Sequence, residues 1–211
     1  MPNGKEEFPM PRVEREEEKK ELAPKKVMPE KEDEEIKKEK EPIEIERKFL
    51  VKELPENLER YPHKEISQGY IAIAEDGTEV RIRKVSREIK GKERNEYYQT
   101  IKSGGEKIRE EIETKISKKQ FEALWPATED KRIEKTRYDI RHETGTIELD
   151  VFKGDLEGLV TTEMEFDSEE KSNEIEPPEW FGEEVTEDEK FKNKNLATFG
   201  NPLEEEKGSE K

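Results

Sequence analysis

The sequence predicts a mainly β protein built on an antiparallel sheet, with a few short helices. Several segments in the middle of the chain alternate apolar and charged residues with a period of two, which is typical of strands whose side chains point to opposite faces. Turn signals such as Asp76-Gly77 separate these segments, and connections of hairpin length favour antiparallel pairing. Many short strands joined in this way indicate a barrel or a sandwich.

We expect about eight strands. In the segment 43–51 the odd positions are mostly apolar, whereas Glu44, Glu46 and Lys48 occupy the even positions. The same alternation marks the later strands, which in chain order are 68–74, 78–85, 96–103, 107–115, 132–140, 146–152 and 159–166.

Two other segments break this alternation. Apolar residues in 117–125 have the i, i+3, i+4 spacing of a short helix, which Ser117 would cap and Pro126 would end. Apolar residues between Trp180 and Leu196 predict a packed C-terminal segment with short helical turns.

The composition divides the chain into three parts. Charged residues make up 46% of it and apolar residues only 28%, so it is not one compact domain from end to end. Residues 1–41 are a charged, low-complexity stretch interrupted by prolines, and we expect a disordered tail because so little apolar surface does not offset the entropy of ordering. Residues 42–200 have the length of an ordinary single domain, and 201–211 form a flexible acidic tail.

Charge and residue usage exclude several classes of function. The formal net charge of −16 argues against nucleic-acid partners, which select basic surfaces. The chain has no apolar run of about 18 residues, so no membrane partner is expected, and its start lacks a secretory signal. Cysteine is absent, which removes disulfides and thiolate chemistry and fits a cytoplasmic location.

The charged faces of the expected strands are segregated by sign. A single wet face would explain any one of these strands, but a solvated face usually mixes signs. If the faces close on one another, paired carboxylates need a cation and paired arginines need a polyanion, and a divalent metal with an oligophosphate satisfies both. The pairs of like charge are Arg81/Arg83, Lys135/Arg137, Glu148/Asp150 and Glu163/Glu165.

A family resemblance begins at Glu44–Lys48, which reads ExExK. This segment resembles the opening strand of the CYTH family, named for CyaB-type adenylate cyclase and thiamine triphosphatase and also called the triphosphate tunnel metalloenzymes. The resemblance covers about residues 42–200, and bacterial members active on inorganic triphosphate are the most similar. It continues through Gln68-Gly69-Tyr70, Arg81-Ile82-Arg83, Thr100-Ile101-Lys102, Arg109–Glu113, Glu134–Tyr138, Glu148–Phe152, Glu163–Glu165, Val185–Asp188 and Asn193–Ala197.

The resemblance implies an eight-stranded antiparallel β-barrel whose lumen is the active site. The charged faces would then point inward, in contrast to the usual small barrel, whose interior is apolar. Helices such as 117–125, the C-terminal segment or a second subunit would cover the apolar outer faces, so a homodimer is one expected possibility.

The resemblance also implies roles for individual side chains. Mg²⁺ or Mn²⁺ would be bound by hard carboxylate oxygens, those of Glu44, Glu46, Asp150, Glu163 and Glu165. Substrate phosphates would be held by Lys48, Arg81, Arg83, Lys102 and Arg137. Lys135 would place the attacking water, and either it or a glutamate such as Glu46 would direct the proton. Salt bridges that support the tunnel would come from Arg109, Glu111, Glu113 and Glu148.

The expected reaction is hydrolysis of the terminal phosphoryl group of a triphosphate, with inorganic triphosphate as the first choice of substrate. Two alternatives on the same fold are cyclisation of ATP to cAMP and hydrolysis of thiamine triphosphate. A third alternative is a non-enzymatic module that binds polyphosphate or nucleotides. The five inward carboxylates argue against that third reading, because a pure anion binder gains little from them.

Overall fold

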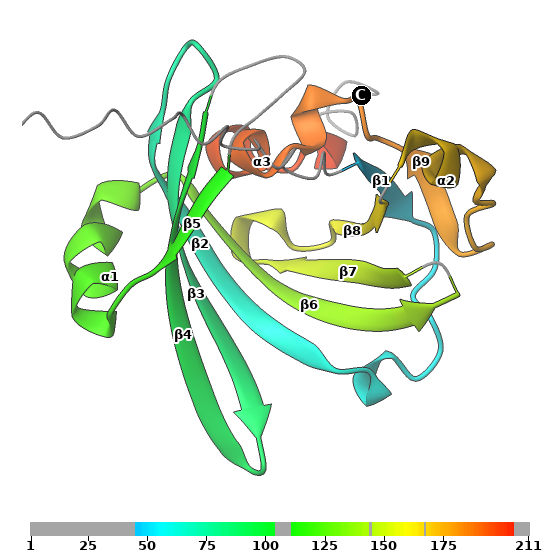
Figure 1. Cartoon of the computed structure of the whole chain (residues 1–211), viewed down its shortest axis with the longest axis horizontal. Helices are drawn as coiled ribbons and strands as arrows, with labels where there is room; N and C mark the ends of the chain where they lie inside the picture. The colour runs from blue at the N-terminus through cyan, green and yellow to red at the C-terminus, as the bar shows by residue number, and fades with distance from the viewer. Residues whose placement is uncertain (1–44, 104–110, 144, 167, 205–211) are drawn as a thin grey trace, which may run out of the picture. The chain divides into compact units, whose positions relative to one another are not determined.

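The computed structural model describes residues 45–103, 111–143, 145–166 and 168–204. Over these residues the chain forms a nine-stranded antiparallel sheet with a few short helices, so the expected fold class is confirmed (Figure 1). The strands follow the spatial order β5-β4-β3-β2-β6-β7-β8-β1-β9. Their bounds are β1 Ile45–Val51, β2 His63–Ile73, β3 Glu79–Ile89, β4 Lys92–Lys102, β5 Glu111–Lys115, β6 Arg132–His142, β7 Gly145–Lys153, β8 Val160–Phe166 and β9 Phe181–Glu184.

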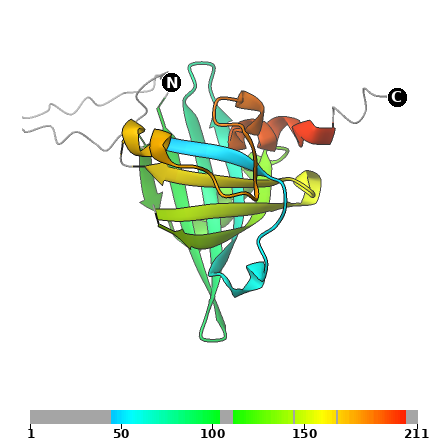
Figure 2. The same ribbon diagram turned by 90° about the vertical axis from the view of Figure 1, so that its right-hand side faces the viewer.

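The sheet curls around its concave face, as Figures 1 and 2 show from two directions. Among the described residues its edges are β5 and β9, which do not pair with each other. The expected eight-stranded barrel is therefore a curled sheet with one additional strand. Strand β9 pairs with β1, with Phe49 opposite Glu184 and Val51 opposite Phe181. To close the barrel, another strand would have to pair with this same edge of β1, which β9 already occupies.

The hairpin of β3 and β4 is longer than the sequence analysis predicted. Its two turn residues, Lys90 and Gly91, have φ angles of 53° and 70°, as a tight type I′ turn requires. Both strands continue to this turn, although the analysis ended one at 85 and began the next at 96. Residues 86–95 are mostly polar or charged on both faces, so they carry no apolar alternation that would mark a strand.

The expected internal helix is present as α1, Lys118–Leu124. Ser117 caps it in a reciprocal pair with Gln120, whose backbone N–H donates to Ser117 Oγ at 3.2 Å while Gln120 Oε1 accepts from the Ser117 backbone N–H at 2.9 Å. Phe121 is buried and lies 5.1 Å from the ring of Tyr97 on β4. The helix therefore covers the outer side of β3 and β4.

The C-terminal segment packs as expected but contains one element that the sequence did not indicate. It comprises α2 Glu169–Glu174, strand β9 and α3 Asn193–Phe199. The short helices confirm the predicted helical turns, whereas β9 was missed because four residues are too few to show an alternation. Phe191 and Leu196 join Tyr70 and Ile133 of the sheet in one apolar cluster.

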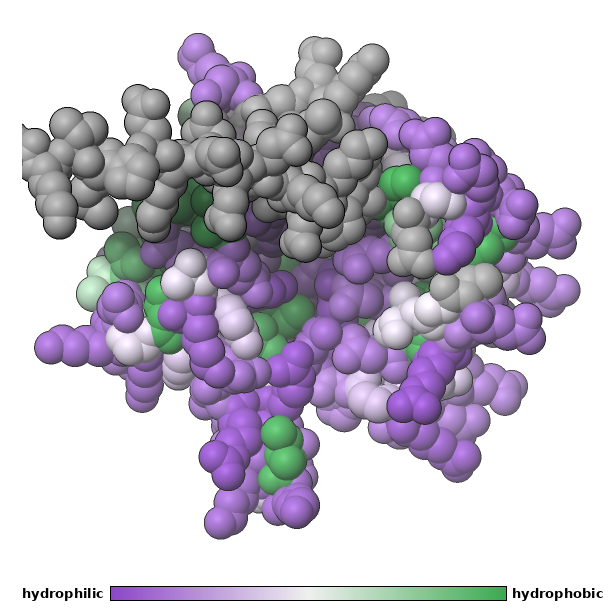
Figure 3. All heavy atoms as spheres, in the orientation of Figure 1, coloured by the Kyte–Doolittle hydropathy of each residue, from purple (hydrophilic) through white to green (hydrophobic). Residues whose placement is uncertain are grey.

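Polar side chains, and few apolar ones, line the concave face of the sheet. On β7, Ile147 and Leu149 enter a second apolar cluster with Phe181 and Met164, while Glu148 between them lines a cavity. The face of the described residues in Figure 3 is accordingly mostly hydrophilic. None of the helices in the described part of the chain is long and apolar enough to cross a membrane.

Candidate active site

The concave face of the sheet encloses a cavity of about 600 Å³. Alternating residues of the strands point into it, because side chains two apart on a strand share a face. Most of the site residues expected from the sequence line this cavity: Glu46, Lys48, Arg81, Arg83, Lys102, Glu111, Glu113, Lys135, Arg137, Glu148, Glu163 and Glu165.

Three expected site residues are not among the lining residues. Glu44 and Arg109 lie outside the described residues. Asp150 is fully buried behind the wall, where Lys135 and Arg137 donate to both of its oxygens. Both oxygens of Glu163 are occupied in the same way, by Lys48 and Arg137, so the expected role of Asp150 as a metal ligand stays a prediction.

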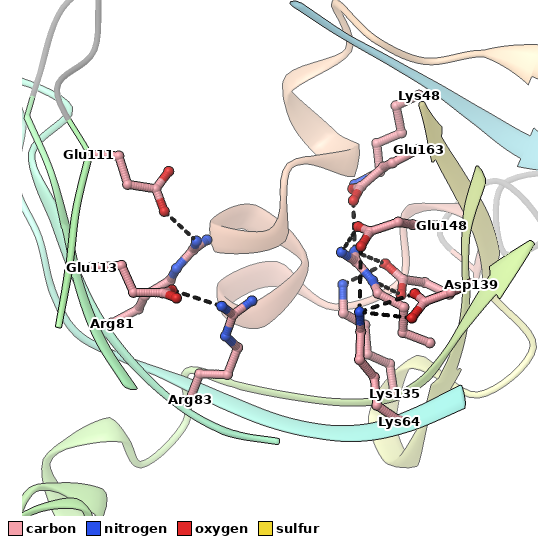
Figure 4. Close-up of polar contacts among 12 residues, drawn as sticks. Lys48, Lys64, Arg81, Arg83, Glu111, Glu113, Lys135, Asp139, Glu148 and Glu163 are labelled. Carbon is pink, nitrogen blue, oxygen red and sulfur yellow. Dashed lines mark hydrogen bonds and ion pairs between the residues drawn. The ribbon is translucent and has the colours of Figure 1, made fainter. Parts of the chain in front are cut away.

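One wall of the cavity is built by β3, β4 and β5. Arg81 Nη2 lies 3.2 Å from Glu111 Oε1, and Arg83 Nη2 lies 2.7 Å from Glu113 Oε2 (Figure 4). Lys102 Nζ contacts the second oxygen of Glu111 at 2.5 Å. The antiparallel register places Lys102 directly opposite Glu111 and thereby explains this contact.

The two arginines of this wall retain unused donors. Arg81 Nε and Arg83 Nε are buried and have no hydrogen-bond partner among the described residues. Buried donors in proteins are usually bonded, so the two N–H groups indicate a ligand with acceptor oxygens. A phosphate group matches the planar fork of a guanidinium.

Arg137 on β6 is the centre of the opposite wall. Its Nε lies 2.6 Å from Asp150 Oδ1, its Nη2 lies 2.7 Å from Glu163 Oε2, and its Nη1 pairs with Glu148. Burial works against its charge, but the surrounding carboxylates outweigh burial and raise the pKa of Arg137. Arg137 therefore stays charged, and in the free protein carboxylates occupy it.

Lys135 lies beside Arg137 with its amine enclosed by protein. Its Nζ is 2.5 Å from Asp150 Oδ2, and the residue is only 3% exposed. Burial and the charge of Arg137 lower the pKa of Lys135 to about 8, against the opposing effect of Asp150. The amine is consequently much easier to deprotonate than an exposed lysine.

Strands β1 and β8 bring the remaining carboxylates together. Glu46 lies directly opposite Glu165, and Lys48 lies opposite Glu163, with 2.9 Å between Lys48 Nζ and Glu163 Oε1. Burial in the wall and the charge of Glu163 raise the pKa of Glu46 to about 7, although its side chain keeps contact with solvent in the cavity. The charges of Lys48, Lys102 and Arg137 oppose this rise.

This corner between β1 and β8 fits a divalent cation in its chemistry. Carboxylate oxygens from adjacent strands are the hard donors that Mg²⁺ and Mn²⁺ prefer. Across the described residues no three acidic or histidine side chains are grouped closely enough to hold a metal ion as they stand. Metal binding would therefore require Glu163 to turn from Lys48, or Glu44 to complete the set.

Some charged side chains in or beside the cavity were not predicted from the sequence. Lys64 and Asp139 pair at 3.0 Å next to Glu148 without lining the cavity, whereas Lys192, just before α3, and Lys194, within it, do line the cavity. Lys190, which precedes these residues in the sequence, is exposed at the surface. Extending the alternation of β2 back to its start would have found Lys64.

Comparisons with known proteins agree with this geometry. The model of the CYTH domain family matches residues 42–198. The inorganic triphosphatase of Nitrosomonas europaea is 47% identical over 156 residues, which are 73% of this chain and 96% of that protein. The inorganic triphosphatase of Acetivibrio thermocellus is 33% identical over 162 residues, which are 73% of this chain and 92% of that protein. A crystal structure of an inorganic triphosphatase matches with a TM-score of 0.57 at 44% identity, over 74% of this chain and 95% of that one.

Proposed function

The chain belongs to the CYTH domain family, and on that premise we propose that it is a metal-dependent triphosphatase that acts on inorganic triphosphate. The observation that carries the proposal is the cavity, in which Arg81 and Arg83 on one wall face Lys48 and Glu163 on the opposite wall (Figure 4). Two relatives named inorganic triphosphatase support this choice of substrate. Hydrolysis of the terminal phosphoryl group would consume water and release phosphate and pyrophosphate.

The cations of both walls hold the phosphates. The arginines bind oxygens through their planar forks, and the lysines act as point charges. The unpartnered Nε groups of Arg81 and Arg83 support direct contact with phosphate oxygens. The residues proposed for this role are Lys48, Arg81, Arg83, Lys102 and Arg137.

We assign the metal to the carboxylates of the β1 and β8 corner, with Glu44 as a further ligand. Mg²⁺ or Mn²⁺ suits these oxygens, and burial together with the charge of Glu163 raises the pKa of Glu46, which a bound cation would counteract. When bound, the ion offsets the charge of the phosphate oxygens and stabilises the charge that develops on them during transfer. The chain's own ligands would be Glu46, Glu163 and Glu165.

We assign Lys135 as the group that accepts the proton of the attacking water. Lys135 lines the cavity and burial lowers its pKa to about 8, so Nζ would accept a proton from a water held against the terminal phosphorus. Asp150 holds the amine in place through the 2.5 Å contact. The ionised Asp150 also stabilises the ammonium group that forms when the proton arrives.

The lining of the cavity favours inorganic triphosphate over ATP or thiamine triphosphate. Among the described lining residues the aromatic ones are Tyr70 and Phe191, and both are buried within an apolar cluster. Trp180 packs on Phe181, with 4.5 Å between ring centroids, and does not line the cavity. A nucleobase or thiamine ring would therefore find no open aromatic face for stacking on these residues.

The test is an assay of the purified full chain with inorganic triphosphate, thiamine triphosphate and ATP, each with Mg²⁺ or Mn²⁺. We expect equal amounts of phosphate and pyrophosphate from inorganic triphosphate, and no cAMP from ATP. Lack of turnover of inorganic triphosphate with either ion would overturn the proposal.

Glu46→Gln tests the metal assignment in the same assay. Loss of a carboxylate ligand should reduce turnover by about 100-fold or more and raise the metal concentration needed for half-maximal rate. The matched control is Glu65→Gln, which removes a carboxylate of β2 that does not line the cavity. A Glu46→Gln variant with unchanged metal dependence would contradict the assignment.

A further inference from the structure

We propose that Glu111, Glu113 and Glu148 are placeholder carboxylates, which occupy the phosphate-binding arginines in the free protein and move to second partners when phosphate arrives. In this scheme Lys64 and Thr100 are positioning residues that receive the displaced carboxylates. The inference rests on the proposed function, because it concerns how the same cavity accepts triphosphate.

The scheme starts from a contact pattern that occurs three times in the cavity. Each phosphate-binding arginine is paired with one glutamate, and each of these glutamates has a second hydrogen-bonding or charged neighbour. The three sets are Arg81–Glu111–Lys102, Arg83–Glu113–Thr100 and Arg137–Glu148–Lys64.

Two of the second partners, Thr100 and Lys102, lie on β4, and the third, Lys64, lies on β2. Lys102 Nζ lies 2.5 Å from Glu111 Oε2, and Thr100 Oγ1 donates to Glu113 Oε2 at 3.1 Å. Thr100 is fully buried, so its hydroxyl is held in place for this contact. Lys102 is itself assigned to phosphate, which leaves Thr100 and Lys64 as partners without a role in the proposed function.

Lys64 offers the sharpest case. It lies on β2 directly opposite Arg137 of β6, and its neighbour Asp139 lies opposite Glu148 of β7. Lys64 Nζ is 3.0 Å from Asp139 Oδ1 and 3.5 Å from Glu148 Oε1. Figure 4 shows the side chain of Lys64 extending toward Asp139 and Glu148.

The exchange has a clear physical reason. A phosphate that binds Arg137 Nη1 must displace Glu148, and the displaced carboxylate would then lie near a phosphate of like charge. The Glu148 side chain is only 25% exposed, so leaving it without a partner would carry a large desolvation cost. Lys64 is already within reach, so Glu148 keeps a cationic neighbour after the exchange.

The scheme predicts opposite effects for the two members of the pair. Removing the placeholder charge frees Arg137, so Glu148→Gln should strengthen the binding of triphosphate. Removing the Lys64 amine leaves the displaced Glu148 carboxylate without a cationic partner, so Lys64→Met should weaken the binding of triphosphate. A metal-ligand role of Glu148 or a purely structural role of Lys64 does not give this pair of signs.

The experiment measures the binding of inorganic triphosphate by calorimetry with a chelator present, so that neither metal nor turnover contributes. Relative to the unaltered chain, we expect a dissociation constant about threefold to tenfold lower for Glu148→Gln and about tenfold higher for Lys64→Met. The double variant should match Glu148→Gln, because Lys64 then has no displaced carboxylate to receive. Lys64→Arg should restore binding and also serves if the Met variant does not fold.

The matched control is Lys153→Met, since Lys153 forms a 2.6 Å ion pair with Glu65 on the same sheet but does not line the cavity. Its binding should be unchanged. Weaker binding by Glu148→Gln would overturn this inference alone, provided that the unaltered chain binds and hydrolyses triphosphate. So would a Lys64→Met substitution that weakens binding equally in the unaltered chain and in the Glu148→Gln chain. A chain that neither binds nor hydrolyses triphosphate would instead overturn the proposed function.

Discussion

Lys135 shows how one buried side chain sets the pH dependence of the proposed reaction. Burial and Arg137 lower its pKa to about 8, and its neutral form, which alone accepts a proton, grows as the pH rises through that value. We therefore expect kcat/KM for inorganic triphosphate, which reports groups of the free protein, to rise with pH and to level off above pH 8. The measurement is a profile of kcat/KM against pH at a fixed metal concentration.

Lys135→Arg separates the proton transfer from the positive charge. Arginine keeps the charge but is not deprotonated in proteins, so turnover should fall by about 100-fold or more and the rising limb near pH 8 should vanish. Binding of triphosphate in the presence of a chelator should change far less. A variant that keeps the limb near pH 8 would show that another group accepts the proton.

Asp150 links the same wall to the stability of the fold. Burial alone would raise its pKa, but Arg137 and Lys135 outweigh burial and hold the pKa below the ordinary carboxyl value. Because the folded-state pKa is the lower one, ionised Asp150 contributes stability above the unfolded-state pKa, and this stability is lost as the pH falls through the folded-state value.

We expect Asp150→Asn to reduce the free energy of unfolding by about 3 kcal/mol at neutral pH, because it leaves two buried cations without their counter-charge. Urea unfolding at neutral and acidic pH measures this difference, which should narrow at the acidic end. The control is Glu184→Gln, which breaks the exposed pair with Arg47 and should cost less than about 1 kcal/mol. Equal losses in the two variants would contradict the structural role of Asp150.

At the scale of elements, the sequence predicts strands wherever one face is apolar. Alternation located eight strands, because burial on one side of a sheet leaves a period of two in the sequence, and the i, i+3, i+4 spacing of apolar residues located the capped helix at 117–125. Residues 86–95 of the β3–β4 hairpin extend beyond that apolar packing and are mostly charged or polar, so no such pattern remains. Strand β9 depends on pairing with β1, a tertiary contact that four residues do not reveal.

The residues of the candidate site likewise fall into those that the sequence predicts and those that depend on contacts between strands. Pairs of like charge within one strand, such as Arg81 and Arg83, were visible in the sequence. The position of Lys64 beside Glu148 depends on the register across β2, β6 and β7, which no single segment encodes. Asp150 shares the alternation of Glu148, but its contacts with Arg137 hold it behind the wall.

Gly69 fixes the distance between β2 and the turn Trp125–Thr128. A Cβ atom at this position would lie 2.5 Å from Thr128 Cβ, and Thr128 is fully buried. Gly69→Ala should therefore lower the free energy of unfolding by about 1–3 kcal/mol through overpacking. It should also reduce kcat/KM, because the flanking Gln68 and Tyr70 line the cavity.

Thermal unfolding and steady-state kinetics together measure this effect. Adding Thr128→Gly to the Gly69→Ala chain should recover part of the stability, since it removes the atoms that the new methyl group meets. An unchanged unfolding midpoint in Gly69→Ala would show that the turn moves away without cost.

At the scale of the whole molecule, the net charge of −16 conceals a local gathering of cations on the concave face. The homodimer expected from the sequence stays a prediction. Ile101 and Ile112 lie opposite each other on β4 and β5 and are 37% and 52% exposed, so they form an apolar rung that a second subunit would cover.

The division into a tail and a domain leads to a prediction about the first 40 residues. The family match begins at residue 42, β1 begins at Ile45, and the described residues that line the cavity run from Glu46 to Lys194. A chain that lacks residues 1–40 therefore retains every proposed site residue, including Glu44. Its kcat and KM for inorganic triphosphate should stay within about twofold of the full chain, since every residue proposed to contact the substrate is retained.

The informative control is Glu44→Gln within the shortened chain. Loss of this proposed metal ligand should raise the metal concentration required for half-maximal rate and lower turnover by about tenfold or more. The two changes lie only a few residues apart in the sequence, so a large contrast between them would place the start of the functional domain between residues 40 and 44. If the shortened chain itself loses activity while its unfolding midpoint is unchanged, residues 1–40 take part in catalysis, and the boundary expected from the composition is wrong.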